Sequence, residues 1–449
     1  MSELILDVRL DSFAEPIGVL VRDVNGALAF AYTAQHAADS KALALSLSLP
    51  LTDEPYADGP TRAFFDNLLQ ERDGVLRHVM ARENLARDDV AGLLAHLGRD
   101  CPGAISVMPE GAVPSKVPGD LEIDYEPLSD AQMETLVRAL HERAPLPEDV
   151  HDPSPLSGVQ SKIALTLLPD GRFGEPKRGS GAPTTHIIKA PDQRHREDAG
   201  LEAAALDLSA GLLIDTAEAR SLRVGVIEVL LITRFDRGKT ADGKIARLHQ
   251  EDFAQALGLP AALKYERNAK TPHRFDAKAI GRVLAQTLDP AAARETFVRA
   301  LLFDLMIGNV DGHAKNHALL HHAGGGVSLA PRYDVMPTRL DRQLTDELAF
   351  NIGAAATLRA ITANDFEIFL DAIGVPRPDQ RPLIEVHAPT MADGLVAAFH
   401  DLDRKRMKRF ADLIAHNVDT LFTALKLTAP SAVKDRDAFV EGGGGWASS

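Results

Sequence analysis

The sequence has little cysteine and no long apolar run. One cysteine, Cys101, occurs in 449 residues, so no disulfide can form within the chain, which favours a reducing compartment. Cys101 lies in a turn-like segment with no base beside it, and we expect it to be structural. No apolar stretch approaches the ~20 residues of a membrane helix. Residues 1–4 lack the basic and apolar regions of a secretory signal. These absences predict a cytoplasmic protein without a membrane partner.

Basic residues are also in deficit. The chain has 49 Lys and Arg against 64 Asp and Glu, a net charge of −15. A protein that grips DNA alone needs a dominant basic face to replace counterions at phosphate, so the balance argues against independent DNA binding. It leaves room for one basic patch or a basic partner. The length predicts two or three domains with ordinary globular cores.

The N-terminal part has the pattern of a small α+β unit. Residues 4–10 alternate apolar and polar side chains, as a half-buried strand does. Residues 19–24 and 27–32 flank Asn25 and Gly26, a dipeptide that favours the positive φ angles of a tight hairpin.

A proline-rich stretch then marks the best domain boundary. Ser129 and Gln132 have capping-box spacing at the start of a predicted helix that stops at Pro145. Further prolines follow up to Pro155. Strands predominate after the boundary and helices from Gln250 onward, which predicts a bilobal α+β fold. We divide the chain into an N-terminal subdomain (1–110), a helix and Pro-rich linker (111–152), a strand-rich lobe (153–236), a helical lobe (237–430) and a flexible tail (431–449).

The most informative segment follows a predicted helix that contains Phe297. Asp311 precedes Asn316 by five residues, the spacing of the protein-kinase catalytic loop. Attack of a hydroxyl on a γ-phosphoryl group needs a carboxylate near the nucleophile and a hard oxygen ligand for Mg²⁺. Asp334, after a short predicted strand, supplies a second carboxylate, and Lys189 ends an apolar strand upstream. Lys189, Asp311, Asn316 and Asp334 follow the order found in kinases.

Each of these residues has a plainer interpretation when taken alone. Lys189 suits a solvent-facing strand end, Asp334 a turn, and the Asp311 loop a hydrogen-bonded connection. Four nearby histidines suggest a metal-dependent hydrolase as another alternative: His313, His317, His321 and His322. Their spacing matches no Cys/His zinc framework, and the only cysteine is distant in sequence. The joint order of the kinase-like residues therefore favours a kinase.

No standard glycine-rich phosphate loop precedes Lys189. Residues 154–162 instead carry one glycine, Gly158, among small polar neighbours, directly before a predicted strand. Backbone N–H groups of such a segment can form a phosphate-facing turn, but the signal is weak when taken alone and favours a plain loop.

Together these segments resemble the HipA family of toxin kinases over nearly the whole chain. The segments that carry the resemblance are residues 45–51, 65–69, 98–104, 157–162, 186–189, 234–237, 248–253, 264–266, 308–316 and 333–334. The resemblance implies a protein-kinase-like fold, related to the phosphoinositide kinases, with an added N-terminal α+β subdomain. It implies a serine/threonine kinase that uses ATP and Mg²⁺.

Site roles follow from the same resemblance. Asp311 would be the catalytic base, Asn316 and Asp334 would hold Mg²⁺, and Lys189 would contact phosphate, with Glu202 as its possible partner. The residues implied to bind ATP are Ser157, Gly158, Val159, Gln160, Ser161, Lys162, Lys189, Thr233, Arg234, Phe235, His313, Lys315 and Tyr333.

The family is regulated by phosphorylation of a serine in the nucleotide loop, where a dianionic phosphate would repel ATP. Ser157 and Ser154 are the candidates here, because Pro155 stands where the family serine is expected. Thr233 likewise replaces an expected Glu at the adenine-side hinge.

Partners are implied as well. Family members bind a HipB-like helix-turn-helix antitoxin, through which they contact operator DNA, and they phosphorylate proteins that include aminoacyl-tRNA synthetases, causing growth arrest and persistence. The changes at Pro155 and Thr233 motivate an alternative, a catalytically weak binding module that mainly co-represses with its antitoxin. A basic run at residues 404–409 could face DNA or a partner, but continued helical periodicity favours a solvated helix face.

Overall fold

The computed structural model describes residues 2–69, 74–147, 161–341, 343–436, 439–440 and 445–446. The chain forms two units, each built from several segments. The first unit comprises Met1–Gly200, Glu218–Ala261 and Ala318–Val327; the second comprises Leu201–Ala217, Ala262–His317 and Ser328–Ser449. The first unit is rich in strands and the second in helices, so the predicted α+β class is confirmed.

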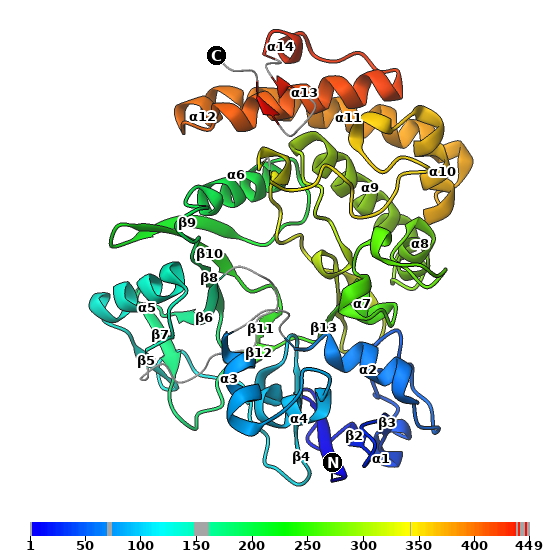
Figure 1. Ribbon diagram of the computed structural model, residues 1–449. Helices are drawn as coiled ribbons and strands as arrows, with labels where there is room; N and C mark the ends of the chain where they lie inside the picture. The colour runs from blue at the N-terminus through cyan, green and yellow to red at the C-terminus, as the bar shows by residue number, and fades with distance from the viewer. Residues whose placement is uncertain are drawn as a thin grey trace. The chain divides into compact units, whose positions relative to one another are not determined.

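The N-terminal part of the first unit is a four-stranded antiparallel sheet with helices (Figure 1). The strand order is β3-β2-β1-β4. The predicted hairpin is confirmed, and Gly26 adopts a φ of 89° in its turn. Cys101 is buried in this core, which raises its pKa to about 12 and fits the structural role predicted for it. The elements are β1 (Leu4–Leu10), β2 (Gly18–Arg22), β3 (Leu28–Tyr32), α1 (Ala34–Ala37), α2 (Asp58–Asp66), α3 (Gly74–Glu83), α4 (Val90–Leu97) and β4 (Ile105–Pro109).

A six-stranded sheet forms the rest of the strand-rich unit, in the order β5-β7-β6-β8-β10-β9. Helix α5 (Asp130–Glu142) covers one face of it, and its capping box between Ser129 and Gln132 is present as predicted. The strands predicted on both sides of Lys189 are confirmed. The sheet contains β5 (Tyr125–Pro127), β6 (Lys162–Leu167), β7 (Phe173–Pro176), β8 (His186–Lys189), β9 (Ala219–Val224) and β10 (Ile227–Thr233). The shorter elements after it are β11 (Arg237–Lys239), β12 (Ile245–Arg247), β13 (Gln250–Asp252), α7 (Phe253–Ala256), β14 (Ala318–His321) and β15 (Val327–Leu329).

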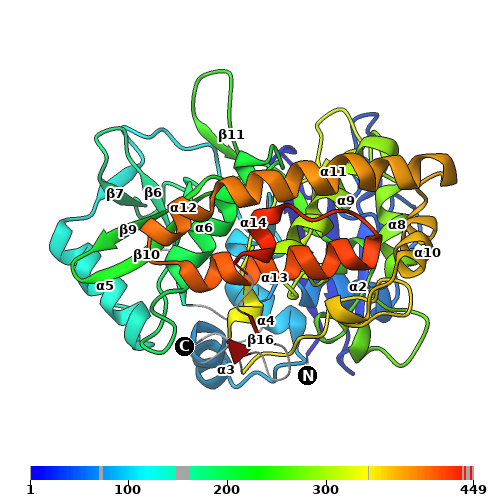
Figure 2. The ribbon, with the colours of Figure 1, turned by 90° about the horizontal axis from the view of Figure 1, so that it is seen from above.

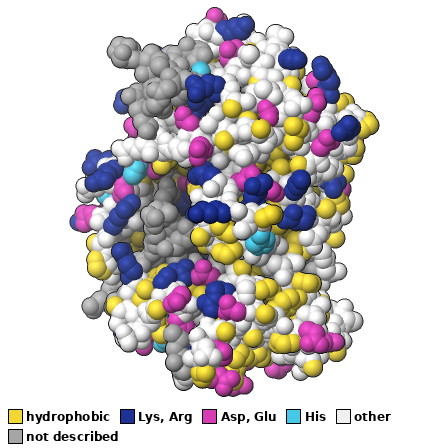
Figure 3. Space-filling view, turned by 45° about the vertical axis from the view of Figure 1, so that its right-hand side comes forward, with side chains coloured by type: hydrophobic (Ala, Val, Ile, Leu, Met, Phe, Trp, Pro, Cys, Tyr) yellow, Lys and Arg dark blue, Asp and Glu magenta, His cyan; other side chains and the backbone are white. Residues whose placement is uncertain are grey.

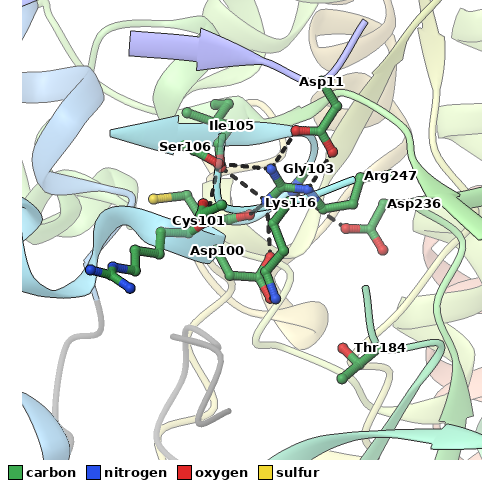
Figure 4. A network of polar contacts seen from close by, with 12 residues as sticks. Asp11, Asp100, Cys101, Gly103, Ile105, Ser106, Lys116, Thr184, Asp236 and Arg247 are labelled. Atoms are coloured by element: carbon green, nitrogen blue, oxygen red, sulfur yellow. Dashed lines mark hydrogen bonds and ion pairs between the residues drawn. The ribbon is translucent and has the colours of Figure 1, made fainter. Parts of the chain in front are cut away.

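A buried ion network joins β12 to the N-terminal subdomain (Figure 4). The Arg247 guanidinium donates to both carboxylate oxygens of Asp11, at 2.6 and 2.7 Å, and to Asp100 at 2.9 Å. It also donates to Ser106 Oγ at 2.9 Å, and Lys116 lies 3.2 Å from Asp100. Because Arg247 is fully enclosed, these partners replace all of its hydration.

A second contact joins two of the segments that carry the family resemblance. The buried Glu251 carboxylate in β13 accepts hydrogen bonds from the Ser46 hydroxyl and, at 3.0 Å, from the Leu47 backbone N–H. His321 lies 2.9 Å from the same carboxylate. Residues 45–51 and 248–253 therefore share one packing interface within the first unit.

Long helices dominate the second unit. α9, α11 and α13 pack together, as Figures 1 and 2 both show. The helix predicted around Phe297 is confirmed as α9. The helices are α6 (Asp198–Gly211), α8 (Ala277–Leu284), α9 (Pro290–Ile307), α10 (Ala363–Ile373), α11 (Arg377–Ala397), α12 (Phe399–Arg404), α13 (Lys408–Leu425) and α14 (Ser431–Lys434).

Two predictions about the C-terminal region need correction. The basic run at residues 404–409 is not one helix face: α12 ends at Arg404, Arg406 takes a φ of 62°, and α13 begins at Lys408. The predicted flexible tail also contains structure. Val433 of α14 is fully buried, and β16 (Phe439–Val440) pairs with β17 (Gly445–Trp446). The glycines at 442–444 lie outside the described residues.

Surface charge is mixed on the face shown in Figure 3, where basic and acidic side chains are interspersed. Within the part of the chain that the structure describes, no helix is both long and apolar enough to cross a bilayer.

We predict that Arg247→Leu destabilises the first unit by about 3–5 kcal/mol, because it removes the cation from the half-buried Asp11 carboxylate and one of the two cations that neutralise buried Asp100. Urea unfolding followed by circular dichroism measures the change. Arg82→Ala is the matched control, since the ion pair of Arg82 with Glu83 is exposed and its loss should cost no more than about 0.5 kcal/mol. Equal effects of the two substitutions would contradict the importance of the network.

Candidate active site

The segment with the kinase-like spacing begins where α9 ends. Gly308 closes the helix with a φ of 79°, a left-handed conformation that glycine adopts without strain. A side chain there would also meet Leu413, since a Cβ would lie 2.8 Å from its Cδ2. The backbone N–H groups of Gly308 and Asn309 both donate to the Asp304 carbonyl, at 3.0 and 2.9 Å. The chain therefore leaves the helix in a defined direction.

Hydrogen bonds then fold residues 309–316 around Asp311. The Asp311 N–H donates to Asn309 Oδ1 at 3.1 Å. Its carbonyl accepts from the His313 N–H at 2.7 Å and from Asn316 Nδ2 at 2.8 Å. Asp311 and Asn316, five residues apart, are thus brought into direct contact.

A buried ion pair ties this loop to the segment that carries Asp334. The Arg332 guanidinium donates to both carboxylate oxygens of Asp304 at 2.8 Å, and Asn309 Nδ2 donates to the same carboxylate at 2.9 Å. A second link lies next to Asn316 and Asp334, where the Tyr333 hydroxyl donates to the Lys315 carbonyl at 2.7 Å. Asp304 and Arg332 are both buried, so this arrangement excludes water.

Asp334 itself is held in an uncommon backbone conformation. Its φ of 56° lies in the left-handed region, which non-glycine residues rarely adopt. Such strain persists only where surrounding contacts impose it, and it is concentrated at functional sites.

Burial and charge set the protonation of the site. Burial, together with the neighbouring Asp334 charge, raises the pKa of Asp311, against the opposing effect of the Tyr265 hydrogen bond. Burial and the Lys264 charge lower the pKa of His313 to about 3, so its imidazole is neutral at pH 7. The charge of Asp334 contributes to both shifts, and it raises the pKa of each residue.

The oxygen atoms at this site suit a hard cation. The Asn316 amide nitrogen is engaged by Asp311, which leaves its carbonyl oxygen on the other side of the amide group. That oxygen and the Asp334 carboxylate are ligands of the type that Mg²⁺ prefers. The buried Nδ1 of His313 has no hydrogen-bond partner among the described residues, as expected of a group that contacts a polar ligand.

The histidine cluster considered for zinc does not assemble in the described residues. His317 Nε2 lies 3.1 Å from the Gly312 carbonyl, while His321 pairs with Glu251 in the first unit. No group of three or more His, Cys, Asp or Glu side chains that could hold a metal occurs in the described ranges.

Two lysines meet on the six-stranded sheet. Lys162 of β6 and Lys189 of β8 are directly paired across antiparallel strands, so their side chains share one face. That face lies opposite α5, because α5 packs on the alternate residues Ile163 and Ile188. An anion bound beside both side chains would interact favourably with each of the two positive charges. Ser161 adjoins the pair, since its carbonyl accepts from the Ala190 N–H at 3.0 Å.

The predicted adenine-side residues lie at the end of β10 and directly after it. Thr233 pairs with His186 at the end of the strand, and Phe235 comes two residues later. The Arg234 guanidinium does not extend into solvent: it donates to both Asp236 oxygens at 2.8 and 2.9 Å and is almost fully buried. Against the effect of burial, Arg234 and Arg237 keep the pKa of Asp236 well below its ordinary value. The Arg234 side chain is therefore committed to this ion pair.

Several predicted residues are not placed relative to one another. Ser154 and Ser157, together with Gly158, Val159 and Gln160, lie outside the described residues. Lys189 belongs to the first unit and Glu202, buried in α6, to the second, so their pairing stays a prediction.

Sequence reasoning missed three residues that shape the site: Tyr265, Asp304 and Arg332. Asp304 could have been found from the sequence, because it is an acidic residue within the apolar run of α9. An acidic side chain buried there needs a partner. Tyr265 lies in residues 264–266, a segment that resembles the family, but the sequence assigned no function to it. Arg332 had no distinguishing pattern of its own.

The fold and this arrangement define a protein-kinase-like α+β protein, and comparisons with known proteins identify its family. Residues 154–399 match the HipA-like C-terminal domain and residues 6–108 the HipA N-terminal domain. The chain belongs to the HipA family.

Relatives and a solved structure agree with this assignment. A protein named putative kinase Y4mE of Sinorhizobium fredii is 32% identical over 89% of this chain and 94% of its own. The serine/threonine-protein kinase toxin HipA of Shewanella oneidensis is 27% identical over 74% of this chain and 76% of its own. A chain in the structure of the Shewanella oneidensis HipA, HipB and operator DNA complex has the same fold, with a TM-score of 0.75 and 22% identity over 96% of this chain and 99% of that one.

We predict that Arg332→Met lowers the stability of the second unit by about 3–5 kcal/mol, because Asp304 would stay buried without its partner. Denaturant unfolding gives the value. The double variant Asp304→Leu/Arg332→Met should recover most of that loss, since apolar replacement of a whole buried pair is often neutral. Arg404→Ala, which breaks an exposed pair with Asp401, is the control. If Arg332→Met behaved like this control, the ion pair would not hold the site together.

Proposed function

We propose that this protein is a toxin kinase that transfers the γ-phosphate of ATP to serine or threonine hydroxyls of another protein, with Mg²⁺ as cofactor. Its family and the kinases among its relatives support the proposal. The observation that carries it is the contact of Asp311 with Asn316 in a loop tied by the Asp304–Arg332 pair to the segment bearing Asp334.

The proposed division of labour assigns each step to a residue. Asp311 accepts the proton of the attacking hydroxyl and orients that hydroxyl toward phosphorus. Asn316 and Asp334 would hold Mg²⁺, which when bound neutralises charge on the phosphate oxygens. The paired Lys162 and Lys189 would bind phosphate oxygens through charge-assisted hydrogen bonds.

The remaining predicted residues complete the nucleotide site in this proposal. His313, Lys315 and Tyr333 would contact ATP from the catalytic loop side. Thr233 and Phe235 would border the adenine through backbone and ring contacts, since Arg234 is engaged by Asp236. Ser157 to Lys162 would form the nucleotide loop, and phosphorylation of Ser157 or Ser154 would block ATP binding by charge repulsion.

The proposal extends to partners. The related solved structure contains HipA, HipB and operator DNA, which supports a HipB-like antitoxin for this chain and contact with operator DNA through it. The net charge of −15 is complementary to a basic repressor. The protein substrate, with an aminoacyl-tRNA synthetase as the leading candidate, would be inactivated by phosphorylation, which would cause growth arrest and persistence.

We expect Asp311→Asn to reduce phosphate transfer from radiolabelled ATP by at least about 10²-fold, because it removes the proton acceptor while preserving shape. Asp334→Asn should have an equal or larger effect through loss of a metal ligand. Glu83→Gln, at a partly exposed residue of the first unit, is the control and should match wild type. Full activity of the Asp311→Asn protein would refute the proposed mechanism.

Mg-ATP should stabilise the wild-type protein against heat. Ligand at about 100 times its Kd adds about 2.7 kcal/mol to folding stability, which a thermal-shift assay detects. The Asp334→Asn variant should show a smaller shift with Mg-ATP than wild type. No shift in wild type, with operator repression retained beside the antitoxin, would favour instead the catalytically weak co-repressor suggested by Pro155 and Thr233.

A further inference from the structure

We infer that Tyr265 is a positioning residue for phosphoryl transfer, which fixes the carboxylate of Asp311 in the orientation needed to receive a substrate hydroxyl. The inference rests on the proposed function and assigns a role to a residue outside the predicted site. Tyr265 lies directly before the 3₁₀ turn Glu266–Asn268, remote in sequence from the catalytic loop.

The contact itself is a single hydrogen bond from the Tyr265 hydroxyl to Oδ1 of Asp311. Backbone hydrogen bonds hold the main chain of Asp311, but they do not set the rotation of its carboxylate. An ionised carboxylate accepts at both oxygens, so Tyr265 at Oδ1 leaves Oδ2 for a substrate hydroxyl. One hydrogen bond thereby defines which oxygen faces the substrate.

The tyrosine is anchored on both sides of its own backbone. The Lys264 carbonyl accepts from the Ala314 N–H at 3.0 Å, which joins this segment to the catalytic loop. The Glu266 N–H donates to the Ala349 carbonyl at 2.9 Å, and the Glu266 carboxylate accepts from the Asn351 N–H at 2.7 Å. The segment is therefore part of a hydrogen-bonded framework within the second unit.

The ring is held as firmly as the backbone. The Arg267 guanidinium lies 4.1 Å from the ring centroid, a cation–π distance. The His313 ring meets it edge-on, with centroids 5.0 Å apart. The ring thus has a guanidinium near its centroid and a second ring packed at nearly a right angle to it, and these contacts limit the freedom of the hydroxyl to leave Asp311.

This anchoring decides between three roles for a hydroxyl that contacts a catalytic base. A tyrosine that accepts the phosphate must approach phosphorus and then carry the added group. A tyrosine that blocks the empty site, here called a plug, must move away when substrate binds. Both roles require mobility, whereas Tyr265 is tied at its backbone and its ring. A fixed donor to a catalytic carboxylate is instead the arrangement expected of a residue that preorganises the base.

The test is steady-state kinetics of Tyr265→Phe with a protein or peptide acceptor and Mg-ATP. Loss of orientation should lower kcat on the order of 10- to 100-fold. The KM for ATP and the thermal shift with Mg-ATP should stay close to wild type, since Phe keeps the ring contacts. Tyr56→Phe, whose hydroxyl donates to the Pro50 carbonyl in the N-terminal subdomain, is the matched control and should retain full kcat.

Replacement of Tyr265 by 4-aminophenylalanine supplies a rescue, because it keeps the ring and restores an N–H donor near the same place. A kcat close to wild type in the 4-aminophenylalanine variant, with a low kcat in Tyr265→Phe, supports the inference even if the Phe variant folds poorly. Wild-type kcat in a folded Tyr265→Phe protein would overturn it, as would a lower KM for the acceptor, which would indicate a plug, or phosphotyrosine at Tyr265. An inactive wild-type protein would overturn the proposed function itself.

Discussion

The buried ion pair between Asp304 and Arg332 is the interaction on which the proposed active site depends. It joins the end of α9, from which the catalytic loop leaves, to the segment that places Asp334. Burial raises the pKa of Asp304, so the attraction of Arg332 does not fully offset the cost of removing the Asp304 carboxylate from water. A buried pair of this kind contributes little to stability beyond what apolar packing would supply. Its retention is explained by the geometry that it imposes.

Much of the fold follows from local sequence patterns. The Asn25-Gly26 hairpin, the capping box at Ser129 and the helix around Phe297 all form as predicted, because turn chemistry, capping and hydrophobic periodicity act over a few residues. The break between α12 and α13 was missed because the apolar period from Phe410 onward does not show that Arg406 turns the chain. The packing of residues 431–434 likewise depends on contacts with α13 that local sequence does not encode.

The candidate site was only partly predictable for the same reason. The five-residue spacing was enough to predict that Asp311 and Asn316 lie close together, since both belong to one loop. The partners that orient them, Tyr265 and Arg332, come from segments 46 and 21 residues from Asp311. Long-range pairs of this kind leave no periodic signal in a single sequence. Arg234 and Asp236 are only two residues apart, but the long-range contact that buries them, from Gly103 to Asp236, leaves no local signal either.

Each unit therefore has a buried polar network that joins distant segments of the chain, one around Arg247 and one around Asp304. The claim that the second network builds a magnesium-nucleotide site is tested most directly by a crystal structure with Mg²⁺ and a non-hydrolysable ATP analogue. The account predicts one metal ion bound by both the Asn316 amide oxygen and the Asp334 carboxylate, with phosphate oxygens completing its coordination. A nucleotide bound elsewhere, or a metal ion that contacts neither residue, would contradict it.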